Sequence, residues 1–148
     1  MRKILIILAC IIAFNSAAYA LPNPYTYHQS AAELTEAVGL TPLLLAETVA
    51  EEFGLINTDY IDIAGKVASV RYSAEGLKVE LRTGREAGLH GIYGDWHKAL
   101  VDGVELGYYN SDLGTAATWE KGGVWYSAFV EGATLERRLA VLLRIAGL

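Results

Sequence analysis

One short segment gathers most of the side chains that could recognise a ligand. Residues 84–97, with the sequence GREAGLHGIYGDWH, contain four glycines. Glycine lets a backbone turn tightly or approach a bound molecule closely, and binding residues are often carried on loops. The candidate binding residues of this segment are His90, Tyr93, Asp95, Trp96 and His97. The alternative is structural: a long connection between hairpins, with its aromatic side chains packed against a sheet.

The same segment lacks the patterns of common catalytic and metal sites. No Gly-Lys-Ser or Gly-Lys-Thr follows the glycines, so a phosphate-binding loop is not predicted. His90 and His97 are seven positions apart and His28 is remote, so the spacing predicts no metal site. The serines fall in predicted caps, strands or turns, where no nucleophile with a neighbouring base is indicated. We therefore predict no catalytic residue, metal or cofactor, and keep as an alternative a hydrolase-like enzyme that uses the 84–97 loop, with His90, Asp95 and His97.

A second candidate surface lies in the aromatic C-terminal part of the chain. Trp125 and Tyr126 are adjacent in a predicted strand, so they point to opposite faces of the sheet. One of them is expected to face the core, and the other water, a helix or a partner. Trp125 therefore joins the candidate binding residues, since an exposed aromatic row on a concave sheet suits a peptide, glycan or acyl chain. Packing in the core and across strands is the alternative.

Helical patterns occur at both ends of the chain. Ser30-Ala-Ala-Glu33 has the spacing of a capping box and predicts a helix that ends at Gly39. A second helix is predicted from Pro42 to about Phe53. A third is predicted to begin near Thr134. Its predicted apolar face consists of Leu135, Leu139, Leu142, Leu143 and Ala146, and its water-facing basic residues are Arg137, Arg138 and Arg144.

Between the second and third helices the period of the sequence changes to two. Residues 77–82 alternate between apolar and charged side chains, as in a half-buried hairpin strand, and Asp102-Gly103 is typical of a tight hairpin turn. These patterns predict an α+β fold: a curved antiparallel sheet of six to seven strands with two N-terminal helices and one C-terminal helix. We expect a single domain over residues 30–148, preceded by an extended lead-in at 21–29.

The first twenty residues have the organisation of an export signal. Arg2 and Lys3 precede an apolar stretch over residues 4–14, and Ala18 and Ala20 fit the cleavage site of signal peptidase. The apolar stretch is too short for a spanning helix. We therefore expect residues 1–20 to be removed, no permanent membrane span, and a periplasmic or extracellular protein. A lipoprotein attached through Cys10 is the less favoured alternative, because the apolar stretch continues past this cysteine.

Charge and composition exclude several classes of partner. The chain carries a net charge of −5, and without residues 1–20 it keeps 17 acidic and 10 basic side chains, a net charge of −7. Such a domain is a poor partner for nucleic acids and anionic lipid surfaces. Without Cys10 no thiol remains, which excludes disulfides and cysteine-bound metals. Residues 33–62 hold seven acids and no base. This acidic stretch is either a solvated surface or the contact surface of a regulatory or inhibitor module.

Several short motifs, taken in order, resemble a known family. They are Val67-Ala-Ser-Val-Arg-Tyr72, Gly91-Ile-Tyr-Gly94, Val101-Asp-Gly-Val-Glu105 and Ala117-Thr-Trp-Glu-Lys-Gly-Gly-Val-Trp-Tyr-Ser127. The chain resembles an uncharacterised extracytoplasmic bacterial domain family of unknown function, which is also found at the outer C-terminus of anti-sigma-factor-like proteins. It departs from that family at 46–55, where a proline-containing stretch is missing.

The resemblance implies a curved sheet distantly similar to lipoprotein-carrier folds, and it brings no catalytic residues. Because a fold by itself does not specify a function, the expectation stays general. We expect a non-catalytic domain that binds an envelope protein, peptide or lipid.

Overall fold

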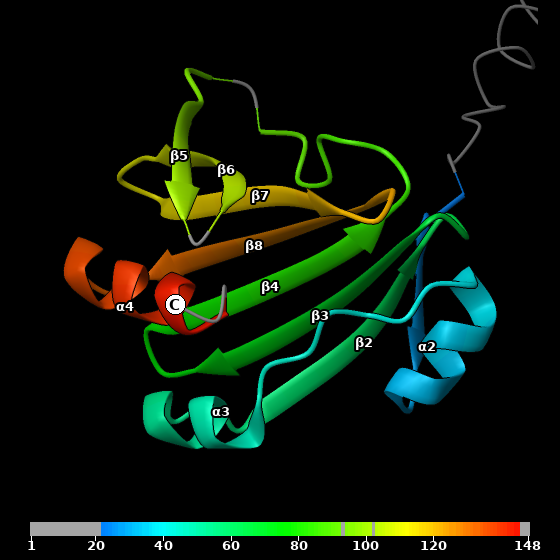
Figure 1. Cartoon of the computed structure of the whole chain (residues 1–148). Coiled ribbons are helices and arrows are strands. Elements are labelled where there is room, and N and C mark those ends of the chain that lie inside the picture. Colours follow the sequence, from blue (N-terminus) through cyan, green and yellow to red (C-terminus); the bar gives the residue numbers. More distant parts are fainter. Residues whose placement is uncertain (1–21, 93, 102, 146–148) are drawn as a thin grey trace, which may run out of the picture.

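The computed structural model describes residues 22–92, 94–101 and 103–145 (Figure 1). The predicted export signal with Cys10, and the residues Tyr93, Asp102 and Ala146, lie outside the described residues. Within the described part of the chain, no helix combines the length and the apolar character that crossing a membrane requires.

In the described part of the chain, eight antiparallel strands form one sheet in the order β1-β2-β3-β4-β8-β7-β6-β5. Their bounds are β1 Tyr25–His28, β2 Asn57–Ile63, β3 Val67–Ala74, β4 Leu77–Gly84, β5 His97–Val101, β6 Val104–Asn110, β7 Gly114–Lys121 and β8 Val124–Gly132. The last strand, β8, returns to the middle of the sheet and pairs with β4 as well as with β7. The predicted α+β class and antiparallel sheet are confirmed, but the sheet has eight strands instead of six or seven.

The additional strand, β1, lies within the segment interpreted as a lead-in. Tyr25 pairs with Ile63 and His28 with Tyr60, which places β1 at one edge of the sheet. A strand of four residues is too short for its alternation to be recognised, and the preceding prolines point to a linker. Its pairing with β2 depends on residues that are distant in the sequence.

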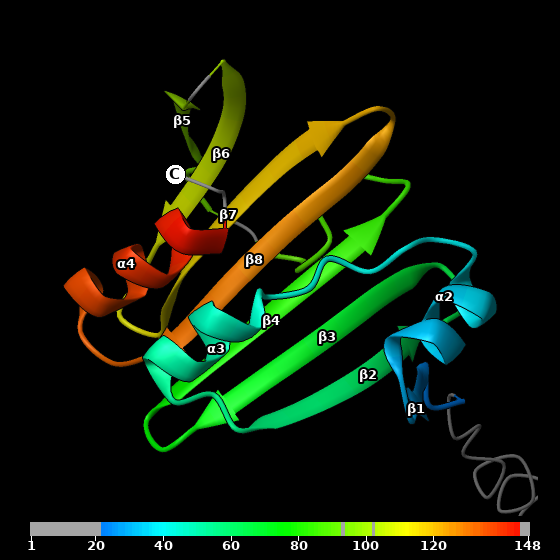
Figure 2. The same cartoon turned by 60° about the horizontal axis from the view of Figure 1, so that its bottom comes forward.

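The three helices within the described ranges cover one face of the sheet, which we call the helix-bearing face (Figure 2). They are α2 (Ala31–Val38), α3 (Glu47–Phe53) and α4 (Leu135–Ile145), two before the central strands and one after them, as predicted. The core consists of apolar side chains from these helices and from alternate strand positions, including Leu34, Phe53, Val70, Leu81, Val130 and Val141. The opposite side of the sheet is the helix-free face.

The ends of α2 follow from the sequence. Ser30 Oγ accepts a hydrogen bond from Glu33 N at 3.3 Å, and the Glu33 carboxylate accepts one from Gln29 N at 2.9 Å. Both bonds satisfy free amides in the first turn. Gly39 ends the helix in the left-handed conformation, with φ of 69°. The predicted capping pattern is therefore confirmed.

The second helix, α3, begins later than predicted. Residues 41–46 are not helical, because two of their amides donate hydrogen bonds to side chains of the sheet. Leu43 N donates to Thr83 Oγ1 at 2.9 Å, and Leu45 N donates to Tyr72 Oη at 3.1 Å. These bonds hold the segment along the sheet until Ala46, whose extended backbone precedes the first turn. The prediction of a helix from Pro42 was wrong for this first part.

The last helix, α4, is rotated relative to the prediction. Arg138, predicted to face water, is only 6% exposed, whereas Leu135, Leu139 and Leu143 are 44%, 43% and 51% exposed. Leu142 is buried as predicted, together with Val141. The cause is a pair of tertiary hydrogen bonds: the Arg138 guanidinium donates to the carbonyl oxygens of Ser111 and Asp112 in the β6–β7 turn, at 3.2 and 3.3 Å.

Candidate functional site

The glycine-rich segment crosses the helix-free face as a loop between β4 and β5. The His90 ring packs against Phe129 of β8 with ring centroids 5.8 Å apart, and Trp96 packs against Tyr109 of β6 at the same separation. Phe129 lies between Ala128 and Val130, which belong to the core, so its side chain points to the face without helices. The loop therefore covers the part of this face formed by β8, β7 and β6.

Glycines allow the loop to lie this close to the sheet. A Cβ atom on Gly84 would lie 2.6 Å from Leu89 Cδ2, and one on Gly94 would lie 2.6 Å from the ring of Tyr109. Both distances are shorter than a carbon–carbon contact allows. The glycines thus permit close packing of the loop, which is the structural role that the sequence offered as the alternative to ligand binding.

A small cavity remains between the loop and the sheet, and we call it the loop cavity. It has a volume of about 210 Å³. Its lining includes Leu89, His90, Ile92, Trp96, Trp125 and Ser127. Loop and sheet thus both contribute to its walls, and its lining is mainly apolar and aromatic, as is usual for ligand sites.

The structure brings three of the six candidate binding residues together in this cavity: His90, Trp96 and Trp125. Asp95 is exposed and does not line it. His97 lies in β5 and packs against Tyr108, with ring centroids 5.3 Å apart. Tyr108 pairs with the core residue Ala117, so this pair lies on the helix-bearing side. Tyr93 is outside the described residues.

Two buried polar atoms of the lining have no hydrogen-bond partner among the described residues. They are His90 Nε2 and Ser127 Oγ. Ser127 is only 2% exposed. Leaving such a group unpaired costs about 1–3 kcal/mol, and most buried polar groups are therefore paired. Two such atoms on residues that line one cavity make this cavity the candidate functional site.

The His90 ring is neutral in this environment. Burial lowers its pKa to about 4, and the nearby positive charge of Arg82 acts in the same direction. The ring also hydrogen-bonds the backbone of Ser127. This contact raises the pKa, so the ring donates in it, and Nε2 has no partner among the described residues. We therefore infer the tautomer that carries its proton on Nδ1, in which Nε2 is an acceptor. The cavity thus offers one acceptor and one hydroxyl.

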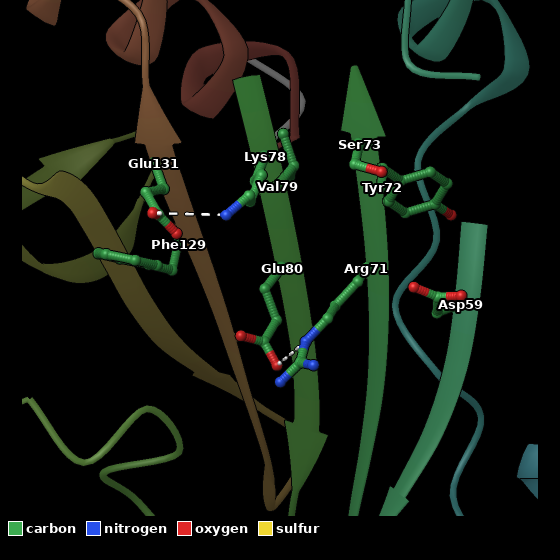
Figure 3. A pocket seen from close by; sticks show the side chains of 9 residues that line it. All are labelled: Asp59, Arg71, Tyr72, Ser73, Lys78, Val79, Glu80, Phe129 and Glu131. Atoms are coloured by element: carbon green, nitrogen blue, oxygen red, sulfur yellow. Dashed lines mark hydrogen bonds and ion pairs between the residues drawn. The ribbon is translucent and has the colours of Figure 1, made fainter. Parts of the chain in front are cut away.

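A network of charged side chains ties the loop to the sheet, and we call it the Glu80 network. Glu80 Oε1 accepts hydrogen bonds from Ser69 Oγ at 2.7 Å and from Arg71 Nε at 3.1 Å. It also accepts two from Arg82, through Nε at 3.0 Å and Nη2 at 2.9 Å. Arg82 Nη1 in turn donates to the carbonyl oxygen of Leu89 in the loop. Figure 3 shows the contact between Glu80 and Arg71.

The Glu80 network is charged although it is largely buried. Burial by itself raises the pKa of Glu80, but Arg82, Ser69 and Arg71 together outweigh it and lower this pKa below its usual value. The side chains of Glu80 and Arg82 are only 16% and 15% exposed. The alternation of charged and apolar residues in β4 indicated that the charged face of this strand is open to water. The pattern could not show that the 84–97 loop covers part of this face.

The residues of the hydrolase-like alternative do not meet. His90 lies on the helix-free face and His97 on the helix-bearing side, while Asp95 is exposed. Sequence analysis missed Ser127, which it interpreted as an ordinary strand or turn serine. A weak signal was present, because Ser127 alternates with the aromatic residues Trp125 and Phe129 along one face of β8. In the described ranges, no three His, Cys, Asp or Glu side chains form a group that could hold a metal ion.

Comparisons with known proteins leave the chain without an assigned relative. No model of a known protein family matches it, and no curated protein or solved structure shows significant similarity to it.

Proposed function

We propose that this protein is a non-catalytic, exported binding domain whose loop cavity takes up one apolar or aromatic group that carries a hydrogen-bond donor. The observation that carries the proposal is the pair of unpaired buried atoms, His90 Nε2 and Ser127 Oγ, on residues that line one aromatic cavity. A bound donor would restore a partner to one or both of them, and each restored bond contributes about 0.5–1.5 kcal/mol.

The size of the cavity limits the ligand. A dry apolar cavity of about 150 Å³ is large enough for benzene, whereas sites for drug-sized ligands begin at about 300 Å³. The loop cavity, at about 210 Å³, suits one ring or one side chain. We therefore expect it to anchor a side chain of a peptide or protein partner, with indole or phenol as the simplest mimic.

The polarity of the cavity limits the ligand further. Neutral His90 offers an acceptor at Nε2, so the bound group should donate a hydrogen bond, as an indole N–H or a phenol O–H does. Trp96 and Trp125 supply aromatic surface for the rest of the ring. An aromatic side chain with a polar tip meets both requirements.

Export to the envelope is part of the same proposal. It is supported by the basic start, the apolar stretch and the Ala18 and Ala20 pattern of the first twenty residues. The proposal also includes a relation to the extracytoplasmic domain family and a distant likeness to lipoprotein carriers. Both are supported by a single antiparallel sheet with helices on one face. Fractionation of producing cells should find a chain that begins at Leu21 outside the cytoplasm. A full-length chain kept in the cytoplasm would contradict export.

Titration with indole tests the cavity. We expect saturable shifts in the ¹H–¹⁵N spectrum of the protein at Leu89, Ser127 and the Trp125 indole N–H. His90→Phe keeps a ring against Phe129 but removes the acceptor, and should weaken binding about tenfold. His97→Phe makes the same change outside the cavity and should leave affinity unaltered. Absence of saturable shifts, or equal effects of the two variants, would refute the proposal.

A further inference from the structure

The pairing between β6 and β7 ends before either strand does. Gly107 pairs with Thr118, and within the described ranges no later residue of β7 pairs with β6. Residues 104–106 of β6 still pair with β5, and residues 119–121 of β7 still pair with β8. Figure 2 shows β6 and β7 moving apart here, and we call the opening between residues 104–106 and 119–121 the strand fork.

A pocket lies in the strand fork. Its volume is about 480 Å³, within the usual range for ligand sites. Both hairpins contribute to its walls, which include Lys98, Val104 and Glu105 from β5 and β6, and Trp119, Glu120 and Trp125 from β7 and β8. Trp125 also lines the loop cavity, so the two sites adjoin each other.

Two acidic residues explain why the strands separate at this point. If the register of β6 and β7 continued past Gly107, it would place Glu105 directly opposite Glu120. Directly opposite side chains begin about 4.5–5.5 Å apart, and like charges in such a pair are destabilising. Separation of the strands relieves this repulsion and leaves both glutamates in the walls of the pocket.

The strand fork also leaves main-chain groups without a strand partner. Along an antiparallel strand, successive residues direct their N–H and C=O groups to opposite neighbours. Lys121 and Val124 flank a two-residue turn and face each other as a bonded pair, so Glu120 directs its N–H and C=O groups away from β8, into the fork. No strand in the described part of the chain receives them. An open edge of this kind is a template for another strand.

The charge of the strand fork favours a basic side chain on such a strand. One base and two acids give the charged lining of the pocket a net charge of −1. Lys98 contacts Glu105 at 2.7 Å, but these side chains are 76% and 65% exposed, so their attraction is weak. Glu120 forms no salt bridge with any described residue, and its Oε1 accepts a hydrogen bond from Gly123 N at 3.2 Å.

We propose that the strand fork binds an extended peptide that carries a basic residue between two apolar ones. The peptide pairs antiparallel with residues 119–121, in the place that β6 leaves, and its central residue exchanges main-chain hydrogen bonds with Glu120. The basic side chain lies on the helix-free side, with Glu120 beside it and Glu105 across the pocket. Its two neighbours point to the other side, toward Val104 and Trp119. This binding does not require a ligand in the loop cavity.

Titration with the capped peptide acetyl-Val-Lys-Val-amide at constant ionic strength, followed by ¹H–¹⁵N NMR, tests the proposal. We expect saturable shifts at Glu105 and Glu120, and none at Leu89 or Ser127 of the loop cavity. Acetyl-Val-Glu-Val-amide should bind about tenfold more weakly, because it adds a third carboxylate to the fork. A lysine peptide that is N-methylated at the lysine keeps the charge but lacks the main-chain donor, and should also bind about tenfold more weakly.

A substitution in the protein shows which group the lysine recognises. Glu120→Gln should weaken binding of the lysine peptide about fivefold, the size of effect expected for one partly exposed charge pair. Glu75→Gln makes the same change at an exposed position outside the fork and should have no effect.

Four results would overturn the proposal. They are shifts that grow linearly with the lysine peptide, equal affinities for the lysine and glutamate peptides, full affinity of the N-methylated peptide, and equal affinities of Glu120→Gln and Glu75→Gln. Indole binding at the loop cavity, measured at Leu89 and Ser127, would be unaffected by that failure.

Discussion

The two faces of the sheet are built from the same strands but are stabilised differently. On the helix-bearing face, Val70, Leu81 and Val130 are fully buried against the helices. On the helix-free face lie Ser69 and Glu80, the chain neighbours of Val70 and Leu81, together with Ser127 of β8, and a loop covers only part of this face. One face is closed by hydrophobic packing, while the other buries polar groups that must find partners.

This difference in pairing places the candidate functional site on the helix-free face. Apolar side chains pack without specific partners, so the helix-bearing face mainly holds the fold together. Its unpaired buried atoms in the described part of the chain, His28 Nε2 in the edge strand β1 and Arg138 Nε in α4, belong to separate parts of the fold. On the helix-free face each buried polar atom must be paired. Most are paired through the Glu80 network, and those that are not, His90 Nε2 and Ser127 Oγ, lie at the loop cavity.

The largest effect on the free energy of unfolding is expected on the helix-bearing face. Leu81→Ala removes a fully buried side chain at the centre of β4, and should lower the free energy of unfolding by about 2–5 kcal/mol through lost burial and a new cavity. Guanidinium denaturation measures this change. Lys78→Ala, on the opposite face of the same strand, should change stability by less than about 0.5 kcal/mol. Similar losses for both variants would contradict the difference between the faces.

The second-largest effect on the free energy of unfolding is expected in the Glu80 network. Glu80→Gln removes the charge that accepts four hydrogen bonds, and should cost about 2–3 kcal/mol of unfolding free energy at pH 7. Glu105→Gln breaks the exposed contact with Lys98 and should cost under about 1 kcal/mol. Equal costs would show that the network is no stronger than a surface ion pair.

Glu80→Gln should also change how the stability of the protein depends on pH. Because the folded state lowers the pKa of Glu80, its stabilising contribution is complete above the usual glutamate pKa of about 4.3. It is lost as the pH falls through the lowered value. Stability measured from pH 6 to pH 3 should therefore fall less in Glu80→Gln than in the unaltered protein.

His90 should produce a smaller effect in a different range of pH. Its pKa is lowered to about 4 in the folded state, whereas an unfolded histidine has a pKa of about 6.5. Between these values the unfolded chain binds more protons, so stability falls as the pH falls. From pH 7 to pH 5 the protein should lose about 1–2 kcal/mol more than His90→Phe does. His97→Phe should keep the full pH dependence of the unfolding free energy. Loss of this dependence in His97→Phe would show that it does not arise from His90.

The smallest effect is expected at Ser127. Its hydroxyl has no hydrogen-bond partner in the part of the chain that the structure describes, so Ser127→Ala should change the unfolding free energy by less than about 0.5 kcal/mol while weakening indole binding. Ser69→Ala is the matched comparison, because that hydroxyl is equally buried and donates to Glu80 at 2.7 Å. It should cost about 1.5–3 kcal/mol. The opposite order of costs would mean that Ser127 has a structural partner.

Much of the local structure could be predicted because its causes are local. Alternation in 77–82 predicted a strand with one apolar face, and Ser30 and Gly39 marked the ends of α2. Where the prediction failed, a distant group had intervened. Thr83 and Tyr72 hold residues 41–46 out of a helix, and two carbonyl groups of the β6–β7 turn bury Arg138 and so rotate α4.

The sequence by itself determined which residues could recognise a ligand, because side-chain chemistry and glycine content are local properties. It named His90, Trp96 and Trp125 separately, in a loop and in a distant strand. Only the tertiary structure decided that they meet, and that Ser127 joins them, since the pairing of β8 with β4 is a long-range contact. Whether a buried polar atom is paired depends on its neighbours in space, and among the described residues the loop cavity is distinguished by two unpaired atoms, His90 Nε2 and Ser127 Oγ, on residues of one lining.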